Sequence, residues 1–148
     1  MLQTHPSRAF RLVDDARRRR VHTPPRVLVA EDDPEMRTIL VRALRRDGYA
    51  VTELTDGGRL LVTLGVQIAD GDHEIDLIIS DIRMPVCSGL DIVSALRQAH
   101  WSVPVILMTA FPDDETLRRA EELHAVLFHK PFALEDLRTA VLNMVPPR

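Results

Sequence analysis

Several features that identify common classes of protein are scarce in this sequence. Cys87 is the only cysteine among 148 residues, which excludes an internal disulfide framework and fits a reducing compartment, so we expect a cytoplasmic protein. No apolar run reaches the roughly 18 residues that a membrane span needs, and the N-terminus lacks the apolar core of a signal peptide, so we expect no membrane partner. The six histidines show no ligand spacing, which argues against a zinc site.

Charge is distributed unevenly along the chain. Residues 1–25 contain six arginines and two aspartates, a net charge of +4, so the net charge of −3 leaves −7 for the other 123 residues. A basic arm could contact nucleic acid or an acidic partner, but such termini are more often solvated. We predict an arginine-rich arm over residues 1–25, one domain over 26–145 and a tail over 146–148, and we do not expect nucleic acid as the main partner.

Apolar runs alternate with helical patterns between the two termini. Strands are predicted at 27–30, 49–54, 75–80, 103–108 and 125–128. Helices are predicted from Pro34 to just before Gly48, from Asp56 onward, and over 89–99, 113–123 and 134–145. Residues 65–74, which contain two glycines and two aspartates, are predicted to form a loop.

Five strands alternating with five helices form a βα repeat, which predicts a parallel sheet covered by helices on both faces. Right-handed crossovers then favour a doubly wound open sheet. Ligands of such sheets bind beyond the carboxyl ends of the strands, near a topological switch point. The residues at those ends are therefore the candidates for a functional site.

Polar side chains stand at the carboxyl ends of four predicted strands. They are Glu31 and Asp32 after the first strand, Asp81 after the third, Thr109 after the fourth and Lys130 after the fifth. Three carboxylates in one crevice repel one another unless a cation joins them, and hard oxygen ligands suit Mg²⁺. A carboxylate can also attack phosphorus, while a metal, a lysine and a hydroxyl balance the phosphoryl charge. We therefore predict that Asp81 accepts a phosphoryl group at a Mg²⁺ site.

Four segments resemble those of bacterial response-regulator receiver domains. They are VLVAEDD at 27–33, DLIISDIRMP at 76–85, VILMTA at 105–110 and HKPF at 129–132. The resemblance covers roughly residues 26–145, with the motifs in the right order and near the right spacing. It implies a flavodoxin-like fold whose five strands have the order 2-1-3-4-5, and a part in two-component signalling.

The resemblance also implies roles for the residues at the strand ends. Asp81 would receive phosphate from a histidine kinase or a phosphotransfer protein. Mg²⁺ would be bound by the carboxylates of Asp32 and Asp81, by Glu31 through water and by the backbone carbonyl of Arg83. Thr109 would hydrogen-bond the phosphoryl group, and Lys130 would form an ion pair with it. A cis Lys130–Pro131 peptide and a tight turn into the helix at Gly89 are implied as well.

The sequence departs from the family pattern in three places. The family usually has an aromatic residue three positions before the lysine, and here Leu127 stands there with Phe128 beside it. An aromatic toggle at that position cannot operate, so we do not expect the helix at 113–123, the strand at 125–128 and the last helix to signal in the usual way. The loop predicted at 65–74 is longer than typical, and the arginine-rich arm has no counterpart in the family core.

Only three residues follow Val145, which leads us to expect a stand-alone receiver that is not an enzyme in the ordinary sense. Its output would be contact with an unidentified downstream protein, a phosphorelay step, or pairing with a second copy upon phosphorylation. The sequence leaves two alternatives open: a receiver-like scaffold that works without phosphate, and a module that contacts nucleic acid through the arm. A phosphohydrolase for small molecules is disfavoured, because Arg83 stands two residues after Asp81 where an acid or base would be needed.

Overall fold

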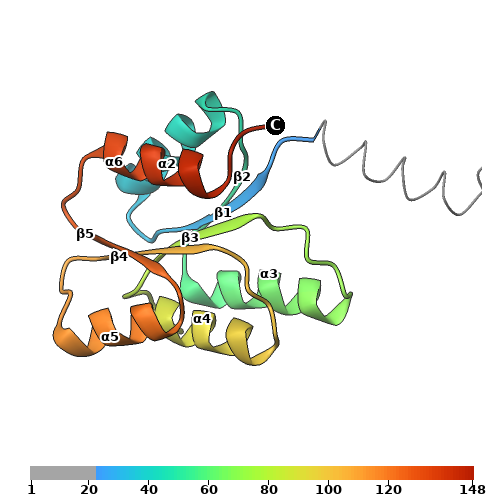
Figure 1. Ribbon diagram of the computed structural model, residues 1–148, viewed down its shortest axis with the longest axis vertical. Coiled ribbons are helices and arrows are strands. Elements are labelled where there is room, and N and C mark those ends of the chain that lie inside the picture. The colour runs from blue at the N-terminus through green and yellow to red at the C-terminus, as the bar shows by residue number, and fades with distance from the viewer. Residues whose placement is uncertain (1–22) are drawn as a thin grey trace, which may run out of the picture.

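The computed structural model describes residues 23–148, so residues 1–22, which hold most of the predicted arginine-rich arm, lie outside the described part. Strands and helices alternate through the described chain (Figure 1). The strands are β1 (Arg26–Ala30), β2 (Ala50–Leu54), β3 (Leu77–Asp81), β4 (Val105–Thr109) and β5 (Val126–His129). The helices are α2 (Pro34–Arg46), α3 (Gly57–Ala69), α4 (Gly89–Gln98), α5 (Asp114–Glu122) and α6 (Leu134–Met144). None of these helices is long and apolar enough to cross a membrane.

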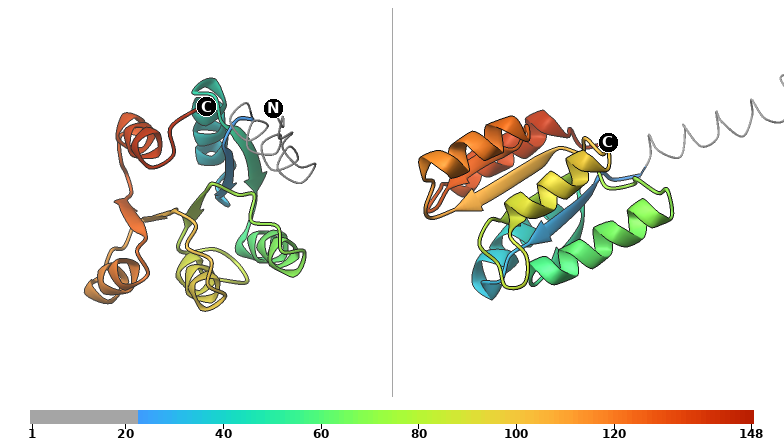
Figure 2. Two further views of the ribbon diagram at one scale, coloured as in Figure 1. Left: turned by 45° about the vertical axis from the view of Figure 1, so that its right-hand side comes forward. Right: turned by 90° about the horizontal axis from the view of Figure 1, so that it is seen from below.

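The strands form one parallel sheet in the order β2-β1-β3-β4-β5, which confirms the predicted flavodoxin-like fold. Helices α2 and α6 cover one face of the sheet, and α3, α4 and α5 cover the other (Figure 2). Strand order reverses between β1 and β3, because β2 pairs on the outer side of β1. The edge beyond Ala30 and Asp81 is therefore the topological switch point, where ligands of such sheets bind.

Strand β3 explains why the apolar runs look continuous in the sequence. Leu77 and Ile79 pack with α2 and α6, whereas Ile78 packs with α3 and α4. Every residue of β3 is buried, since helices cover both faces of the sheet. The same burial extends to its last residue, Asp81, which places an acid at the end of an apolar strand.

Side-chain caps fix the start of four helices on the edge where the strands end. Asp33, Asp56, Ser88 and Asp113 each accept a hydrogen bond from a backbone N–H in the first turn of the helix that follows. The predicted starts at Asp33 and Asp56 are therefore confirmed. Gly48 has a φ of 101°, a left-handed value that suits a residue just past a helix end.

The prediction of a loop over residues 65–74 is wrong in its first half, because α3 continues to Ala69. Val66 and Ile68 belong to this helix, and Gly65 is tolerated in it at a cost of about 1 kcal/mol relative to alanine. The loop begins at Asp70, and Gly71 reverses the chain with a φ of 67°. Other predicted element boundaries agree with the observed ones to within two residues.

Candidate functional site

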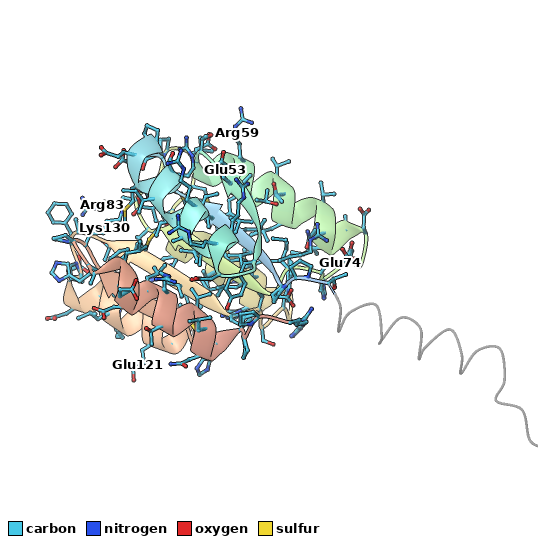
Figure 3. All side chains as sticks on the ribbon, turned by 90° about the horizontal axis from the view of Figure 1, so that it is seen from above. Glu53, Arg59, Glu74, Arg83, Glu121 and Lys130 are labelled. Carbon is cyan, nitrogen blue, oxygen red and sulfur yellow. The ribbon has the colours of Figure 1, made fainter. Side chains whose placement is uncertain are left out.

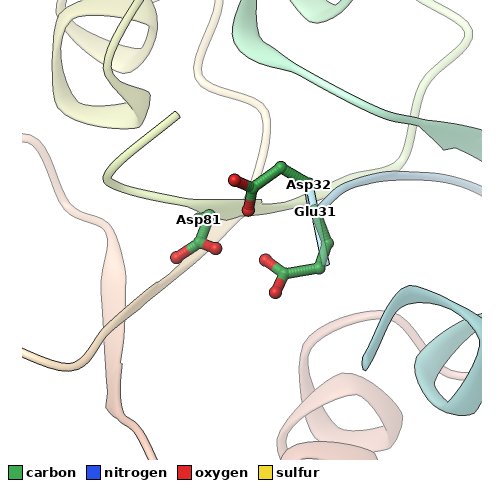
Figure 4. A group of neighbouring side chains, drawn as sticks. All are labelled: Glu31, Asp32 and Asp81. Carbon is green, nitrogen blue, oxygen red and sulfur yellow. The ribbon is translucent and has the colours of Figure 1, made fainter. Parts of the chain in front are cut away.

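Three carboxylates meet where β1 and β3 end (Figure 4). Ala30 pairs with Ser80 in the sheet, so the residues that follow, Glu31 and Asp81, are brought side by side. Glu31, Asp32 and Asp81 each offer an oxygen, and these oxygens lie within 4.8 Å of one another. Glu31 and Asp81 are buried and Asp32 is exposed, so the cluster opens to solvent on one side.

Lys130 connects this cluster to β5. Its Nζ atom lies 2.9 Å from Asp81 Oδ2 and 3.0 Å from Glu31 Oε1. The backbone of Lys130 is held by β4, because its N–H donates to the carbonyl of Thr109 at 2.8 Å. The Lys130–Pro131 peptide is cis, as the resemblance implied. One ammonium therefore binds two acids that stand at the ends of two different strands.

The cluster contains three carboxylates and one ammonium, and this excess of acid shifts the pKa values of its members. Burial, followed by the hydrogen bond and charge of Asp81, raises the pKa of Glu31 to about 8. Burial alone would lower the pKa of Lys130, but its hydrogen bonds to Asp81 and Glu31 outweigh burial and raise that pKa. Lys130 thus stays cationic at neutral pH, while Glu31 resists losing its proton.

The donor set fits a hard divalent cation. Three carboxylates supply only oxygen, the ligand type that Mg²⁺ prefers, and the open side at Asp32 leaves room for water. A cation at this point would also relieve the repulsion that raises the pKa of Glu31. The residues present therefore fit the predicted Mg²⁺ site.

Thr109 and Arg83 lie beside the cluster in different ways. Thr109 ends β4 and is buried, and its Oγ1 accepts a hydrogen bond from the Phe111 N–H at 3.1 Å. The Arg83 side chain is exposed, and its Cζ lies 4.6 Å from the centre of the Phe111 ring. Figure 3 shows Arg83 and Lys130 at the same end of the molecule. Phe111 was not identified from the sequence, because no local pattern indicates that its ring lies over Arg83.

Gly89 explains how closely α4 approaches Asp81. A Cβ atom at this position would lie 2.5 Å from the carbonyl oxygen of Asp81, which no side chain tolerates. The Gly89 N–H donates to the carbonyl of Ile82 at 2.9 Å and closes the loop between β3 and α4. The tight turn implied at Gly89 is therefore present.

The loop between β3 and α4 also packs against the start of α3. Val86 has a φ of 77°, a left-handed value that strains a β-branched residue, and its side chain is 86% exposed. Cys87 is half-buried, and its carbonyl oxygen would lie 2.2 Å from a Cβ at Gly57. The glycine that begins α3 therefore allows the loop after Asp81 to pack against this helix.

Leu127 occupies the position where the family usually has an aromatic residue, and it is half-buried against the layer of α3, α4 and α5. Side chains alternate along a strand, so Phe128 faces the opposite layer. There its ring packs edge-on against Phe132, with 5.3 Å between the ring centres. The neighbouring aromatic therefore cannot replace Leu127 on the face where a toggle would act.

The structure thus brings Glu31, Asp32, Asp81 and Lys130 together and places Thr109 next to them in the sheet. The Arg83 side chain stands outside this group, and its expected contribution is a backbone carbonyl. Arg37 was missed: its guanidinium donates to the backbone carbonyl of Glu31 at 2.8 Å and holds the end of β1. No sequence signal distinguishes this arginine from the other charged residues of α2.

Comparisons with known proteins agree with this geometry. The family model described as "Response regulator receiver domain" matches residues 27–142. The chain is 33% identical over 119 residues to the transcriptional regulatory protein PdtaR of Mycobacterium tuberculosis, covering 80% of this chain and 55% of the relative. It is 34% identical over 127 residues to the transcriptional regulatory protein PrrA of Mycobacterium bovis, covering 85% and 52%. The chain therefore spans about half the length of these curated relatives.

Solved structures show the same fold. A receiver domain of the Francisella response regulator 1452 superposes with a TM-score of 0.72 at 25% identity, covering 81% of this chain and 95% of that one. The response regulator TrrA of Thermotoga maritima, solved in complex with Mg(2+)-BeF, gives a TM-score of 0.68 at 26% identity, covering 82% and 99%. The strand order, the acidic cluster and the family match lead to one conclusion: the chain belongs to the response regulator receiver domains of two-component signalling.

Proposed function

We propose that this receiver accepts a phosphoryl group on Asp81 from a histidine kinase or a phosphotransfer protein and thereby switches the binding of a protein partner. The observation that carries the proposal is the position of Lys130, whose Nζ lies 2.9 Å from Asp81 Oδ2 inside a cluster of three carboxylates. A lysine so placed attracts a phosphoryl group toward the aspartate. The receiver domain itself is proposed to span residues 26–145.

The transfer uses Asp81 as the nucleophile. One carboxylate oxygen of Asp81 forms a bond to phosphorus as the bond from phosphorus to the donor histidine nitrogen breaks. The imidazole leaves and recovers its proton from solvent. The burial of Asp81 keeps bulk water away from one side of the acceptor.

Lys130 and Thr109 are proposed to hold the product. The Lys130 ammonium, freed from Asp81 Oδ2, would pair with a phosphoryl oxygen and retain its contact with Glu31. The Thr109 hydroxyl, which now accepts from the Phe111 N–H, would turn to donate its proton to a second phosphoryl oxygen. Both residues would therefore exchange a partner when Asp81 is modified.

Mg²⁺ fits the acidic cluster, and when bound it supplies positive charge that shields the phosphoryl oxygens from the carboxylates. Asp32 and Asp81 are proposed to bind it directly, Glu31 through water and Arg83 through its backbone carbonyl. Of these, Asp32 has the exposed carboxylate, so it is the natural point of entry for the ion.

The proposal is tested by incubating the protein with acetyl phosphate and Mg²⁺ and following the intact mass. Wild type should gain one phosphoryl group, and Asp81→Asn should gain none. Asp33→Asn is the matched control, because Asp33 is the next acid but caps α2, a task that asparagine performs equally well. Equal uptake by wild type and Asp81→Asn, or no uptake by either, would contradict the proposal.

A scaffold that works without phosphate is favoured by one observation, the leucine in place of the usual aromatic at position 127. If this second function is correct, Asp81→Asn will bind the downstream protein as tightly as wild type does. Measurement of partner affinity with and without phosphorylation separates the two functions.

A further inference from the structure

Helix α3 exposes more apolar surface than the other described helices do. Of the ten large hydrophobic side chains exposed in residues 23–148, four lie on α3: Leu61, Val62, Val66 and Ile68. Val62 is 67% exposed and Val66 is 55% exposed. Arg59 is the one charged residue in the 13 residues of this helix. An exposed apolar surface on an amphipathic helix indicates that another segment or protein packs against it.

Three of these four side chains, those of Leu61, Val62 and Val66, lie on one stripe of α3. Leu60 and Leu64 point into the core, and with 3.6 residues per turn the opposite side carries Leu61, Val62, Gly65, Val66 and Ala69, which we call the α3 stripe. A Cβ at Gly65 would meet nothing within 4 Å, so this fold does not require the glycine. A glycine inside a helix costs about 1 kcal/mol relative to alanine, and it permits another segment to approach closely. Helix α3 lies at one edge of its layer, with α4 on one side of it only, which leaves the stripe accessible (Figure 2).

An acidic loop continues from the C-terminal end of the stripe. Residues 70–76 contain Asp70, Asp72, Glu74 and Asp76. Arg26 forms an ion pair with Glu74, and the Arg26 N–H donates to Asp76 Oδ2 at 2.8 Å. The acidic loop therefore lies against the start of β1, only a few residues from the point where residues 1–22 join the described chain.

Residues 1–22 carry the complementary groups in the matching order. Moving back from Thr23, the chain contains Arg17 to Arg20, then Asp14 and Asp15, and then a mainly apolar group at 9–13, in which Phe10, Leu12 and Val13 surround Arg11. Moving away from Arg26, the body presents first the acidic loop and then the α3 stripe. A helix of this length extends about 20 Å, and the residues from Arg17 back to Phe10 span up to about 24 Å when extended. Residues 9–20 hold five arginines and two aspartates, so their net charge of +3 is opposite in sign to that of the acidic loop, and the order and length of the two segments also match.

We propose that residues 9–20 dock on α3 of the same chain. The apolar group at 9–13 covers the α3 stripe, and the four arginines face the acidic loop. Arg26 and Arg148 already pair with Glu74 and Asp76, so Asp70 and Asp72 are the carboxylates assigned to the arginine run. The stripe reaches toward Val86 at its other end, since Gly58 lies against the Val86 side chain. The docked segment would therefore end beside the loop that follows Asp81.

Limited digestion of the full chain with trypsin tests this docking, because a docked arm is cleaved slowly after Arg8 to Arg20. Mass spectrometry follows the loss of the arm. We expect cleavage to be at least about threefold faster in Val66→Glu and in the double variant Asp70→Asn/Asp72→Asn than in wild type. Added salt should speed cleavage of wild type, because screening weakens the arginine contacts. A synthetic peptide of residues 1–22 corrects for direct effects of salt on trypsin.

Matched controls remove charge or add it elsewhere. Leu117→Glu introduces an acid at a similarly exposed apolar position of α5, and Glu121→Gln/Glu122→Gln removes two adjacent acids from the same helix. Both should be cleaved at the wild-type rate, and circular dichroism confirms folding of every variant. If wild type is cleaved as fast as Val66→Glu, the docking is refuted. If protection of wild type rises with protein concentration, the arm binds a second copy, which overturns docking within one chain.

Discussion

Arg138 in α6 lies against Asp47 at the end of α2, with Nη2 2.6 Å from Oδ1 and Nε 2.8 Å from Oδ2. Lys130 lies against Asp81 and Glu31 at similar distances. The hydrogen bond from Arg138 lowers the pKa of Asp47, whereas burial and the neighbouring Asp81 raise the pKa of Glu31 to about 8. Similar groups thus produce opposite shifts. The Asp47–Arg138 cluster is satisfied and ties two helices together, while the cluster of Glu31, Asp81 and Lys130 holds more acid than its lysine balances, which suits the cation and the phosphoryl group that we propose for it.

The largest expected difference concerns phosphoryl uptake. Lys130→Met should slow phosphorylation by acetyl phosphate by at least about 100-fold, because loss of one preorganised donor costs about that factor in comparable sites. Arg138→Met should leave the rate unchanged, since Arg138 contacts only Asp47 and Glu135 among the ion pairs of the described residues. Single-turnover phosphorylation followed by mass spectrometry measures both rates. Equal slowing in the two variants would mean that a general loss of folding, and not the lysine, is responsible.

The second largest expected effect concerns the pH dependence of stability, which Glu31 should dominate. In EDTA, the folded protein retains a proton on Glu31 up to about pH 8, whereas the unfolded chain loses it near the ordinary glutamate pKa of 4.5. The folded state therefore binds more protons between these values, and the free energy of unfolding should fall as pH rises, by about 1.4 kcal/mol per unit of pKa difference at most. Glu31→Gln should remove this fall, and Mg²⁺ should reduce it. Urea unfolding at several pH values measures it, and a flat profile for wild type would contradict the expectation.

Two glycines extend the comparison to the backbone. Gly89→Ala should lower the free energy of unfolding by about 1–3 kcal/mol, because the new Cβ would press on the Asp81 carbonyl and push α4 away from the site. Gly65→Ala is the matched change on the open surface of α3, and it should raise the free energy of unfolding by about 0.5–1 kcal/mol. Urea unfolding distinguishes them by the sign of the change. Equal effects would show that the close approach at Gly89 is relieved elsewhere.

The smallest expected effect concerns Asp47. Its pKa is lowered in the folded protein, so its contribution to stability is present above the unfolded pKa of 3.8 and is lost as pH falls below it. Asp47→Asn should therefore reduce the melting temperature slightly at pH 7 and leave it unchanged near pH 2. Calorimetry at the two pH values checks this, and an equal reduction at both would assign the effect to packing.

The strand ends could be predicted from the sequence because their evidence is local. Asp81 follows an apolar run, Lys130 precedes a proline, and Asp33 precedes a helix start. The neighbouring residues in the sequence therefore indicate the position of each one. The length of α3 could not be predicted from such evidence, because Gly65 and the aspartates after it are typical of loops. The Arg83–Phe111 contact and the Asp47–Arg138 pair join residues far apart in sequence, and no local pattern selects one arginine among many.

The sheet order gives the contact of Lys130 a mechanical meaning. Asp81 ends the central strand, whereas Lys130 ends β5, a strand at the rim that pairs with β4 alone. The ion pair of Lys130 with Asp81 therefore links the edge strand β5 to the central strand β3 across β4. A change in the charge on Asp81 would change the strength of this ion pair. The strand that can shift in response is β5, because an edge strand has hydrogen bonds to one neighbour only.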